Sequence, residues 1–266
     1  MNRFGYYDPT SVQKAAGIAA DKADAKYLAG GQSLLATMKL GLAEPSDLID
    51  LAQIPELRGI RVEGNGTAIA IGAMTRHAEV AASMEVAARI PALVNLACVI
   101  GDRQVQNRGT LGGSIANNDP AADWPAAVLA LGATIHTNRR KIAADDFFTG
   151  FYGTALQAAE LITSVSFPVP KRAAYMKFRQ PASRFALVGV FVAQAAQGVR
   201  VAVTGAGNRG VFRAKAMEDA LAKSWTPEAL SSIAVAVAEM QSDLHASAEY
   251  RAHLVNVMAR RAVAAA

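Results

Sequence analysis

Residues 107–123 read NRGTLGGSIANNDPAAD and combine three glycines, a threonine, a serine and a cluster of Asn, Asp and Pro. Because glycine has no Cβ, backbone N–H groups in such a turn can face a ligand, and several together form a concave positive site that suits phosphate. Gly, Asn, Asp and Pro are also the usual residues of surface turns. The stretch alone therefore fits an anion cradle and an ordinary turn about equally well.

A second glycine-rich turn far upstream favours the cradle. Ala29-Gly30-Gly31-Gln32-Ser33 follows a short apolar run and precedes a predicted helix over 34–40. A helix N-terminus carries unpaired N–H groups and a partial positive charge, so this turn is a natural seat for a pyrophosphate. It matches neither the Walker loop nor the Rossmann fingerprint. Two such turns on one chain suggest one long ligand that contains a diphosphate.

The composition is that of a folded globular protein. Hydrophobic residues make up 52% and charged residues 18% of the 266 residues, and the formal net charge is +5. The basic residues are scattered and show no interleaving with aromatics, so the sequence predicts no nucleic-acid partner. The apolar runs are too short for a membrane span and the N-terminus lacks a signal peptide, so we expect a soluble, cytoplasmic protein.

The single cysteine, Cys98, excludes an intramolecular disulfide. One thiolate also cannot hold an iron–sulfur cluster, which needs several cysteine ligands. Cys98 lies in an apolar segment, where a free cysteine usually behaves as a small buried hydrophobe. We therefore expect it to be buried and to have no redox role.

The first two thirds of the chain predict an α/β unit followed by a strand-rich unit. A helix after Thr10, with Gln13 completing a capping box, is followed by strands at 26–28 and 47–51, and Pro55 marks a plausible boundary. Alternating runs at 59–62 and 67–71 predict a β-hairpin. Further predicted elements are helical segments over 77–96, interrupted by Pro91, a helix at 126–131, and strands at 133–137 and 161–169.

The last third predicts strands first and helices after. Three strand-like runs at 175–179, 186–192 and 199–203 precede predicted helices at 214–223, 227–240 and 246–262. This order indicates a separate α+β subdomain with a three-stranded antiparallel sheet and three helices. The predicted divisions are 1–56, 57–172 and 173–266.

With these motifs assembled, the chain resembles the FAD-binding medium subunit of the molybdenum hydroxylases, the family of bacterial carbon monoxide dehydrogenase and xanthine dehydrogenase. The resemblance covers essentially the whole chain in order. It rests above all on the two glycine motifs at their separation, with shorter matches at 75–80, 119–123, 146–150, 160–163 and 247–251.

The resemblance implies a two-part N-terminal FAD-binding region of the vanillyl-alcohol-oxidase-like type and a C-terminal sheet with helices. It implies no catalytic residue and no metal ligand in this chain. A molybdopterin-containing large subunit and a [2Fe-2S] small subunit would be its partners, in a dimer of heterotrimers. The implied FAD contacts are Ala29, Gly30, Gly31, Gln32, Ser33, His77, Ile100, Thr110, Leu111, Gly112, Gly113, Ser114, Asp123, Ile162, Thr163 and Arg179.

Several of these residues also have a purely structural interpretation. His77 is at least as well explained as a cap after a strand-to-helix turn, and Asp123 as the cap of the following helix. Arg179 and Lys177 alternate on one predicted strand and would share a face, which a solvated surface explains as well. Gln32 stands where many relatives have His. Residues 207–213 lack the proline expected there, which leaves contacts at that segment open.

The function that these residues predict is electron transfer. Electrons would pass from the [2Fe-2S] clusters of a partner through FAD to an external acceptor, with this chain positioning and tuning the flavin. Two other functions remain open. One is a non-catalytic module that binds a nucleotide or another anion, and the other is a stand-alone flavin oxidase, which the lack of an evident catalytic base disfavours.

Overall fold

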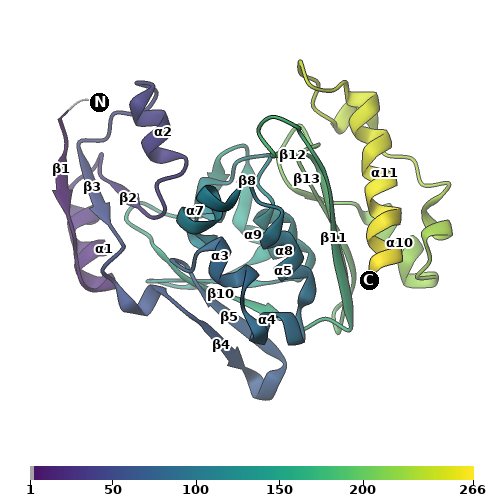
Figure 1. The fold of residues 1–266 in the computed structure, drawn as a ribbon, viewed down its shortest axis with the longest axis horizontal. Coiled ribbons are helices and arrows are strands. Elements are labelled where there is room, and N and C mark those ends of the chain that lie inside the picture. The colour runs from purple at the N-terminus through teal and green to yellow at the C-terminus, as the bar shows by residue number, and fades with distance from the viewer. Residues whose placement is uncertain (1–2) are drawn as a thin grey trace.

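A computed structural model describes residues 3–266. The chain forms three units that follow one another across the longest axis of the molecule (Figure 1). Each unit has its own sheet, and helices from the central unit lie between the central sheet and the C-terminal one. Within the described residues no helix is both long and apolar enough to cross a membrane. Nor does any cluster of three or more His, Cys, Asp and Glu side chains there suit a metal ion.

The N-terminal unit is a small parallel sheet with strand order β1-β3-β2. Helix α1 begins after Ser11, whose side chain accepts a hydrogen bond from the Lys14 amide at 3.3 Å. The predicted cap at Thr10 is therefore wrong by one residue. Strand β1 was not predicted, since it has only three residues and is defined by its partner β3. The elements are β1 Gly5–Tyr7, α1 Val12–Asp21, β2 Lys26–Leu28, α2 Leu34–Lys39 and β3 Asp47–Asp50.

The central unit is a five-stranded antiparallel sheet with strand order β4-β5-β10-β6-β7. The predicted β-hairpin is confirmed, because β4 pairs antiparallel with β5. The strands are β4 Ile60–Glu63, β5 Ala68–Gly72, β6 Thr134–Thr137, β7 Lys141–Ala143 and β10 Ile162–Pro168, with a small pair β8 Phe148–Gly150 and β9 Gly153–Thr154. The helices are α3 His77–Ala81, α4 Met84–Arg89, α5 Pro91–Cys98, α6 Arg103–Arg108, α7 Leu111–Asn117, α8 Trp124–Ala130 and α9 Ala144–Phe147; 3₁₀ turns cover Pro55–Leu57 and Gly64–Gly66.

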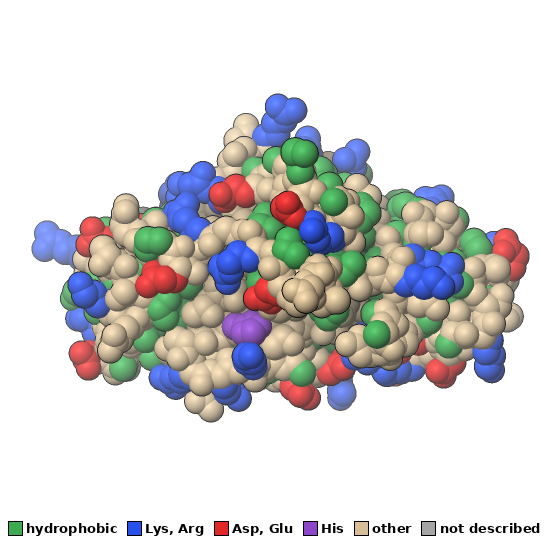
Figure 2. All heavy atoms as spheres, turned by 90° about the horizontal axis from the view of Figure 1, so that it is seen from below, with side chains coloured by type: hydrophobic (Ala, Val, Ile, Leu, Met, Phe, Trp, Pro, Cys, Tyr) green, Lys and Arg blue, Asp and Glu red, His purple; other side chains and the backbone are tan. Residues whose placement is uncertain are grey.

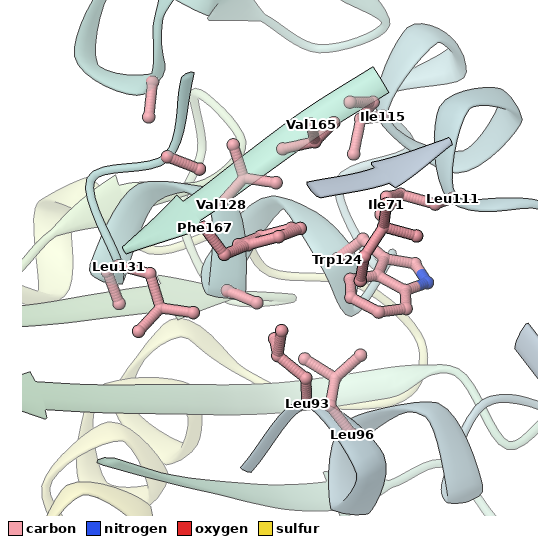
Figure 3. Close-up of a cluster of buried hydrophobic side chains, with 14 of the residues drawn as sticks. Ile71, Leu93, Leu96, Leu111, Ile115, Trp124, Val128, Leu131, Val165 and Phe167 are labelled. Atoms are coloured by element: carbon pink, nitrogen blue, oxygen red, sulfur yellow. The ribbon is translucent and has the colours of Figure 1, made fainter. Parts of the chain in front are cut away.

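The core of the central unit lies between its sheet and its helices. Trp124 is fully buried there, with Ile71 of β5, Phe167 of β10 and Leu96 of α5 around it (Figure 3). Cys98, the last residue of α5, is exposed and does not contribute to this core. The expectation that Cys98 is buried is therefore wrong, because α5 turns that position toward solvent.

The C-terminal sheet has four strands in sequence order, where the sequence predicted three. The additional strand β14 has only two residues, and its pairing with β13 defines it. Helices were predicted at 214–223 and 246–262 and both are present, but 227–240 holds only two 3₁₀ turns, so that predicted helix is wrong. The elements are β11 Arg172–Arg179, β12 Ala186–Ala195, β13 Gly198–Thr204, β14 Phe212–Arg213, α10 Lys215–Lys223 and α11 Ala248–Ala265, with 3₁₀ turns at Pro227–Leu230 and Val237–Glu239.

The C-terminal sheet is covered on both faces. Helices α5 and α8 of the central unit pack against one face, and α10 and α11 pack against the other (Figure 1). Tyr175 and Phe191 of this sheet belong to the same hydrophobic cluster as Trp124. The central and C-terminal units therefore share part of one core.

Candidate functional site

A cavity of about 680 Å³ is enclosed by residues from all three units. This volume lies within the range of small-molecule and cofactor sites. The first glycine turn and β2 contribute from the N-terminal unit, and α7 and the start of β10 contribute from the central unit. The loop between β11 and β12 contributes Ser183, Arg184 and Phe185 from the C-terminal unit.

The two glycine turns touch each other at this cavity. A Cβ on Gly30 would lie 2.1 Å from the Arg108 carbonyl oxygen, and a Cβ on Gly113 would lie 3.3 Å from the Ala29 Cβ. Gly31 has φ +75°, a conformation that side-chain-bearing residues rarely adopt. The close approach of the turns, which are about eighty residues apart in the sequence, thus requires glycine at position 30, and the backbone conformation favours it at position 31.

The two turns differ in which backbone donors are free. The N–H groups of residues 30–33 donate to no other group within the described chain, and all four residues line the cavity. In the second turn three successive amides are already used, because Leu111 donates to the Thr75 carbonyl, Gly112 to the Ala73 carbonyl and Gly113 to the Thr110 hydroxyl. The first turn is therefore the stronger backbone cradle for an anion.

The second turn contributes hydroxyl groups and a close surface. Thr110 is the N-cap of α7, and its Oγ1 accepts from the Gly113 amide at 3.1 Å, which leaves the hydroxyl proton free to donate. Ser114 lines the cavity one turn further on. Arg108 is exposed and does not line the cavity, so a charge from that side chain is not part of the site.

Most of the predicted contact residues come together around this cavity. Its lining includes Ala29, Gly30, Gly31, Gln32, Ser33, His77, Ile100, Thr110, Gly112, Gly113, Ser114, Asp123 and Ile162. Apolar side chains, among them Leu51, Met74 and Leu161, form much of the remaining wall. An elongated ligand with a diphosphate and flat apolar groups fits this combination of an anion cradle and apolar walls.

Comparison with known proteins matches this architecture over the whole chain. Residues 2–170 match the model described as the FAD binding domain in molybdopterin dehydrogenase, and residues 173–266 match the CO dehydrogenase flavoprotein C-terminal domain. The chain belongs to this family.

The similar proteins span nearly the full length of the chain. The carbon monoxide dehydrogenase medium chain of Hydrogenophaga pseudoflava is 38% identical, with 99% of this chain and 97% of that protein covered. The nicotine 6-hydroxylase medium subunit of Paenarthrobacter nicotinovorans is also 38% identical, with 97% and 95% covered. A solved structure of the H. pseudoflava carbon monoxide dehydrogenase superposes with a TM-score of 0.90, covering 100% of this chain and 97% of that one.

Asp123 lies at the cavity wall and occupies the N-cap position of α8, but its side chain does not cap the helix. Its side chain makes no capping hydrogen bond, so the capping interpretation is wrong. Instead the carboxylate accepts from the Tyr175 hydroxyl at 2.5 Å and from the Lys177 ammonium at 2.9 Å. Burial raises the pKa of Asp123, while the Lys177 charge and both hydrogen bonds oppose that rise. Within the family fold, this side chain joins the central unit to the C-terminal sheet.

His77 is buried beside the cavity and is held by Trp124. The Trp124 indole donates to His77 Nδ1 at 3.0 Å, which assigns the remaining ring proton of the neutral imidazole to Nε2. Burial lowers the pKa of His77 to about 4, so the ring is neutral at physiological pH. His77 is the first residue of α3, after the N-cap Arg76. The side chain therefore has a structural partner and can still present a neutral donor to the cavity.

Three predicted contact residues lie outside the cavity lining. Leu111 is fully buried in the core, and Thr163 donates its hydroxyl to the His136 carbonyl at 3.2 Å. Arg179 is exposed and lines a small neighbouring pocket. The interpretation of Lys177 as part of a solvated face is wrong, because its side chain is only 4% exposed.

Sequence reasoning missed the two partners of Asp123. The sequence leaves a solvated face open for Lys177 and indicates no role for Tyr175, yet the Lys177 side chain is only 4% exposed and Tyr175 is buried. The available signal was a lysine two residues from a tyrosine in the middle of a strand whose other central residues, Ala173, Ala174, Met176 and Phe178, are apolar. Such a lysine needs a buried partner when its face packs inward.

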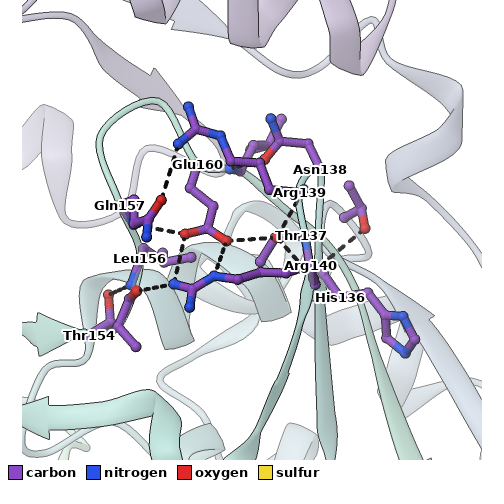
Figure 4. Close-up of polar contacts among 12 residues, drawn as sticks. His136, Thr137, Asn138, Arg139, Arg140, Thr154, Leu156, Gln157 and Glu160 are labelled. Carbon is purple, nitrogen blue, oxygen red and sulfur yellow. Dashed lines mark hydrogen bonds and ion pairs between the residues drawn. The ribbon is translucent and has the colours of Figure 1, made fainter.

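A second polar cluster, centred on Glu160, supports the loop before β10, which also lines the cavity. Glu160 accepts hydrogen bonds from Arg140 at 3.0 and 3.1 Å, from the Thr137 hydroxyl at 2.8 Å and from the Gln157 amide at 2.8 Å (Figure 4). The next two residues, 161 and 162, line the cavity. Glu160 has all of its oxygens occupied by the protein, so its role is to position this loop.

Proposed function

We propose that this chain is the FAD-binding electron-transfer subunit of a molybdenum hydroxylase complex. The observation that carries the proposal is the contact between the two glycine turns at the cavity, with four backbone donors on the first turn that bind no other group in the described chain. The relatives named above are medium chains or subunits of dehydrogenases and hydroxylases, which agrees with that geometry. When bound, FAD would supply the electron-transfer chemistry between a partner subunit and an external acceptor.

The proposed roles follow from where each group lies. The amides of residues 30–33, with the hydroxyls of Thr110 and Ser114, would hold the diphosphate, and Gly113 would allow its close approach. Ile100, Asp123 and Ile162 would contact the flavin side, and His77 would offer a neutral donor. A supporting role, in which they hold the backbone of the cavity wall in place, would fall to Leu111, Gly112 and Thr163. Arg179 would lie outside the direct contacts.

We also propose the partners and the division of the chain. A molybdopterin-containing large subunit and a [2Fe-2S] small subunit would complete the enzyme as a dimer of heterotrimers. The divisions 1–56, 57–172 and 173–266 would correspond to the three larger sheets, with a vanillyl-alcohol-oxidase-like arrangement of the first two units around FAD. Figure 2 shows Lys and Arg side chains mixed with acidic and apolar ones on the face that it presents, which suits protein partners better than nucleic acid.

The experiment that tests this function is reconstitution of the purified chain with FAD. We expect one FAD per chain and the two visible absorption bands of an oxidised flavin, and FMN, which lacks the diphosphate bridge and the adenosine, should bind more weakly. Binding of other nucleotides with no preference for FAD would instead support a non-catalytic anion-binding module. Turnover of a small substrate by the isolated chain would support a stand-alone flavin oxidase.

A further inference from the structure

Three polar side chains from two units meet beneath the cavity wall. Asp123 comes from the segment that precedes α8, and Tyr175 and Lys177 come from β11 of the C-terminal sheet. The side chains of Asp123 and Lys177 are 5% and 4% exposed. Ion pairs this deeply buried are rare, because both charges lose much of their hydration. Further hydrogen bonds or a functional role must offset that desolvation cost.

Tyr175 and Lys177 do not line the cavity, but Asp123, which they both hold, does. Besides the Asp123 carboxylate, the Lys177 ammonium donates to the Val99 carbonyl at 3.1 Å. Val99 precedes Ile100, which lines the cavity from the end of α5, and Asp123 lines it from the start of α8. One ammonium group therefore connects two walls of the cavity that are more than twenty residues apart in the sequence.

The same sheet holds the backbone of the segment before Asp123. The Thr204 hydroxyl donates to the Ala122 carbonyl at 2.7 Å, and the Gly205 amide donates to the Pro120 carbonyl at 2.8 Å. Thr204 is fully buried. The wall formed by residues 120–123 is thus fixed through both its backbone and its carboxylate by the C-terminal unit.

The neighbouring strand leaves room for this contact. Gly189 of β12 pairs with Lys177, and a Cβ on Gly189 would lie 2.3 Å from the Tyr175 hydroxyl oxygen. Any side chain there would push the phenol away from Asp123. Burial, followed by the charge of Asp123, raises the pKa of Tyr175 well above 10, so this hydroxyl stays protonated and donates.

We propose that Tyr175 and Lys177 are positioning residues of the cofactor site, which hold the Asp123 carboxylate in place so that the C-terminal unit sets the charge presented to the flavin. This inference rests on the proposed function. Lys177 balances the carboxylate and Tyr175 orients it. Where the Asp123 carboxylate stays ionised, removal of the ammonium leaves an uncompensated negative charge at the wall, which disfavours the more negatively charged reduced cofactor.

The test is a redox titration of the full-length chain loaded with FAD. Lys177→Met should lower the midpoint potential by at least about 30 mV, which for a two-electron couple is a tenfold change in the ratio of affinities for the two flavin states. Tyr175→Phe should lower it by a smaller amount, because only a neutral donor is lost. Lys177→Arg keeps the charge and should return the potential to within about 10 mV of the original.

The matched control is Arg200→Met. Arg200 pairs with Asp145 at 2.9 Å, also between the central and C-terminal units, but neither residue lines the cavity. This variant should lower thermal stability and leave the flavin potential unchanged. Tyr175→Phe keeps the ring that packs near Phe191 and remains measurable even if Lys177→Met fails to fold.

The outcomes separate this inference from the proposed function. If the unmodified chain binds no FAD, the proposed function is wrong. If it binds FAD but Tyr175→Phe and Lys177→Met leave the potential where Arg200→Met leaves it, the positioning role is wrong while the function stands. A lowered midpoint potential in Lys177→Met and Tyr175→Phe, together with a near-original potential in Lys177→Arg, supports the inference.

Discussion

His77 shows how a single buried side chain couples the site to pH. The pKa of this imidazole falls from 6.5 to about 4 because burial penalises its charged form, and the Trp124 indole donates to the same neutral ring. In the unfolded chain the histidine takes up a proton below about pH 6.5. Protonation therefore stabilises the unfolded state first, and folding stability decreases as the pH falls from 6.5 toward 4.

We expect His77 to reduce the free energy of unfolding by about 2 kcal/mol between pH 7 and pH 5. Urea unfolding at several pH values should show this slope, and His77→Asn, which keeps an acceptor near the indole but does not titrate there, should flatten it. His245→Asn, at an exposed position, is the control and should keep the original slope. An unchanged slope in His77→Asn would show that His77 titrates normally.

The cradle can be tested at Gly30. A Cβ there would lie 2.1 Å from the Arg108 carbonyl oxygen, and because that atom belongs to the backbone it cannot move aside cheaply. Gly30→Ala should separate the two turns and weaken FAD binding by more than about tenfold, roughly 1.4 kcal/mol. Fluorescence titration with FAD measures this loss.

The control for Gly30 lies in α1. A Cβ on Gly17 meets nothing within 4 Å, so Gly17→Ala should leave FAD affinity unchanged and stabilise the helix by about 0.5–1 kcal/mol. Equal FAD affinity in both variants would argue that the turns do not form the diphosphate site. Gly112 is less suitable, because a Cβ there would meet the Ala73 backbone and disturb folding as well as binding.

Among the elements, the loop before β10 depends on the buried carboxylate of Glu160. Burial by itself would raise the pKa of Glu160, but hydrogen bonds from its three partners outweigh it and lower the pKa to about 2. The carboxylate therefore contributes stability above pH 4.5, and this contribution is lost as the pH falls toward 2. Arg140, the partner, is partly exposed and screened by solvent, which limits the gain.

Glu160→Gln should lower the free energy of unfolding by about 2 kcal/mol at pH 7 and flatten its dependence on pH below 4.5. Urea unfolding at pH 7 and pH 4 measures both effects. Glu85→Gln breaks an exposed pair with Arg89 in α4 and should change stability by less than about 0.5 kcal/mol. Equal effects of the two substitutions would mean that the buried cluster contributes no more than a surface pair.

The elements differ in how far the sequence predicts them. The β4–β5 hairpin and helices α10 and α11 were predicted because their patterns are local. Strands β1 and β14 were missed, since two or three residues carry no periodicity and the partner strand defines them. Residues 227–240 have the composition of a helix but form two short 3₁₀ turns, against which α11 packs.

The residues of the candidate site also differ in how far the sequence predicts their arrangement. The glycine turns were predictable because close backbone approach demands glycine wherever it occurs. The partners of Asp123 were not, because the pairing of Asp123 with Lys177 depends on how the C-terminal sheet docks on α8. Arg179, at the end of β11, lies in a neighbouring pocket outside the cavity lining, which the sequence pattern of the strand alone does not indicate. The local sequence pattern thus indicates the glycine turns, whereas the docking of the C-terminal unit determines the partners of Asp123.

At the scale of the whole molecule, the central and C-terminal units are joined by more than the site. Tyr175 and Phe191 of the C-terminal sheet belong to the core around Trp124. Arg200 of β13 also pairs with Asp145 of α9 at the same interface. Because neither unit can bury its facing surface without the other, we expect them to unfold as one cooperative unit.

The two tryptophans of the chain test this cooperativity, since Trp124 lies in the central core and Trp225 in the C-terminal unit, beneath the Arg172 guanidinium. Trp225→Phe leaves only the central reporter, and Trp124→Phe leaves only the C-terminal one. Each substitution changes stability, so fluorescence is compared with circular dichroism of the same variant. We expect the two thermal midpoints to coincide in both proteins. If Trp225 fluorescence changes well before the helical signal is lost, the C-terminal unit opens on its own, and the cavity wall at Asp123 would open with it.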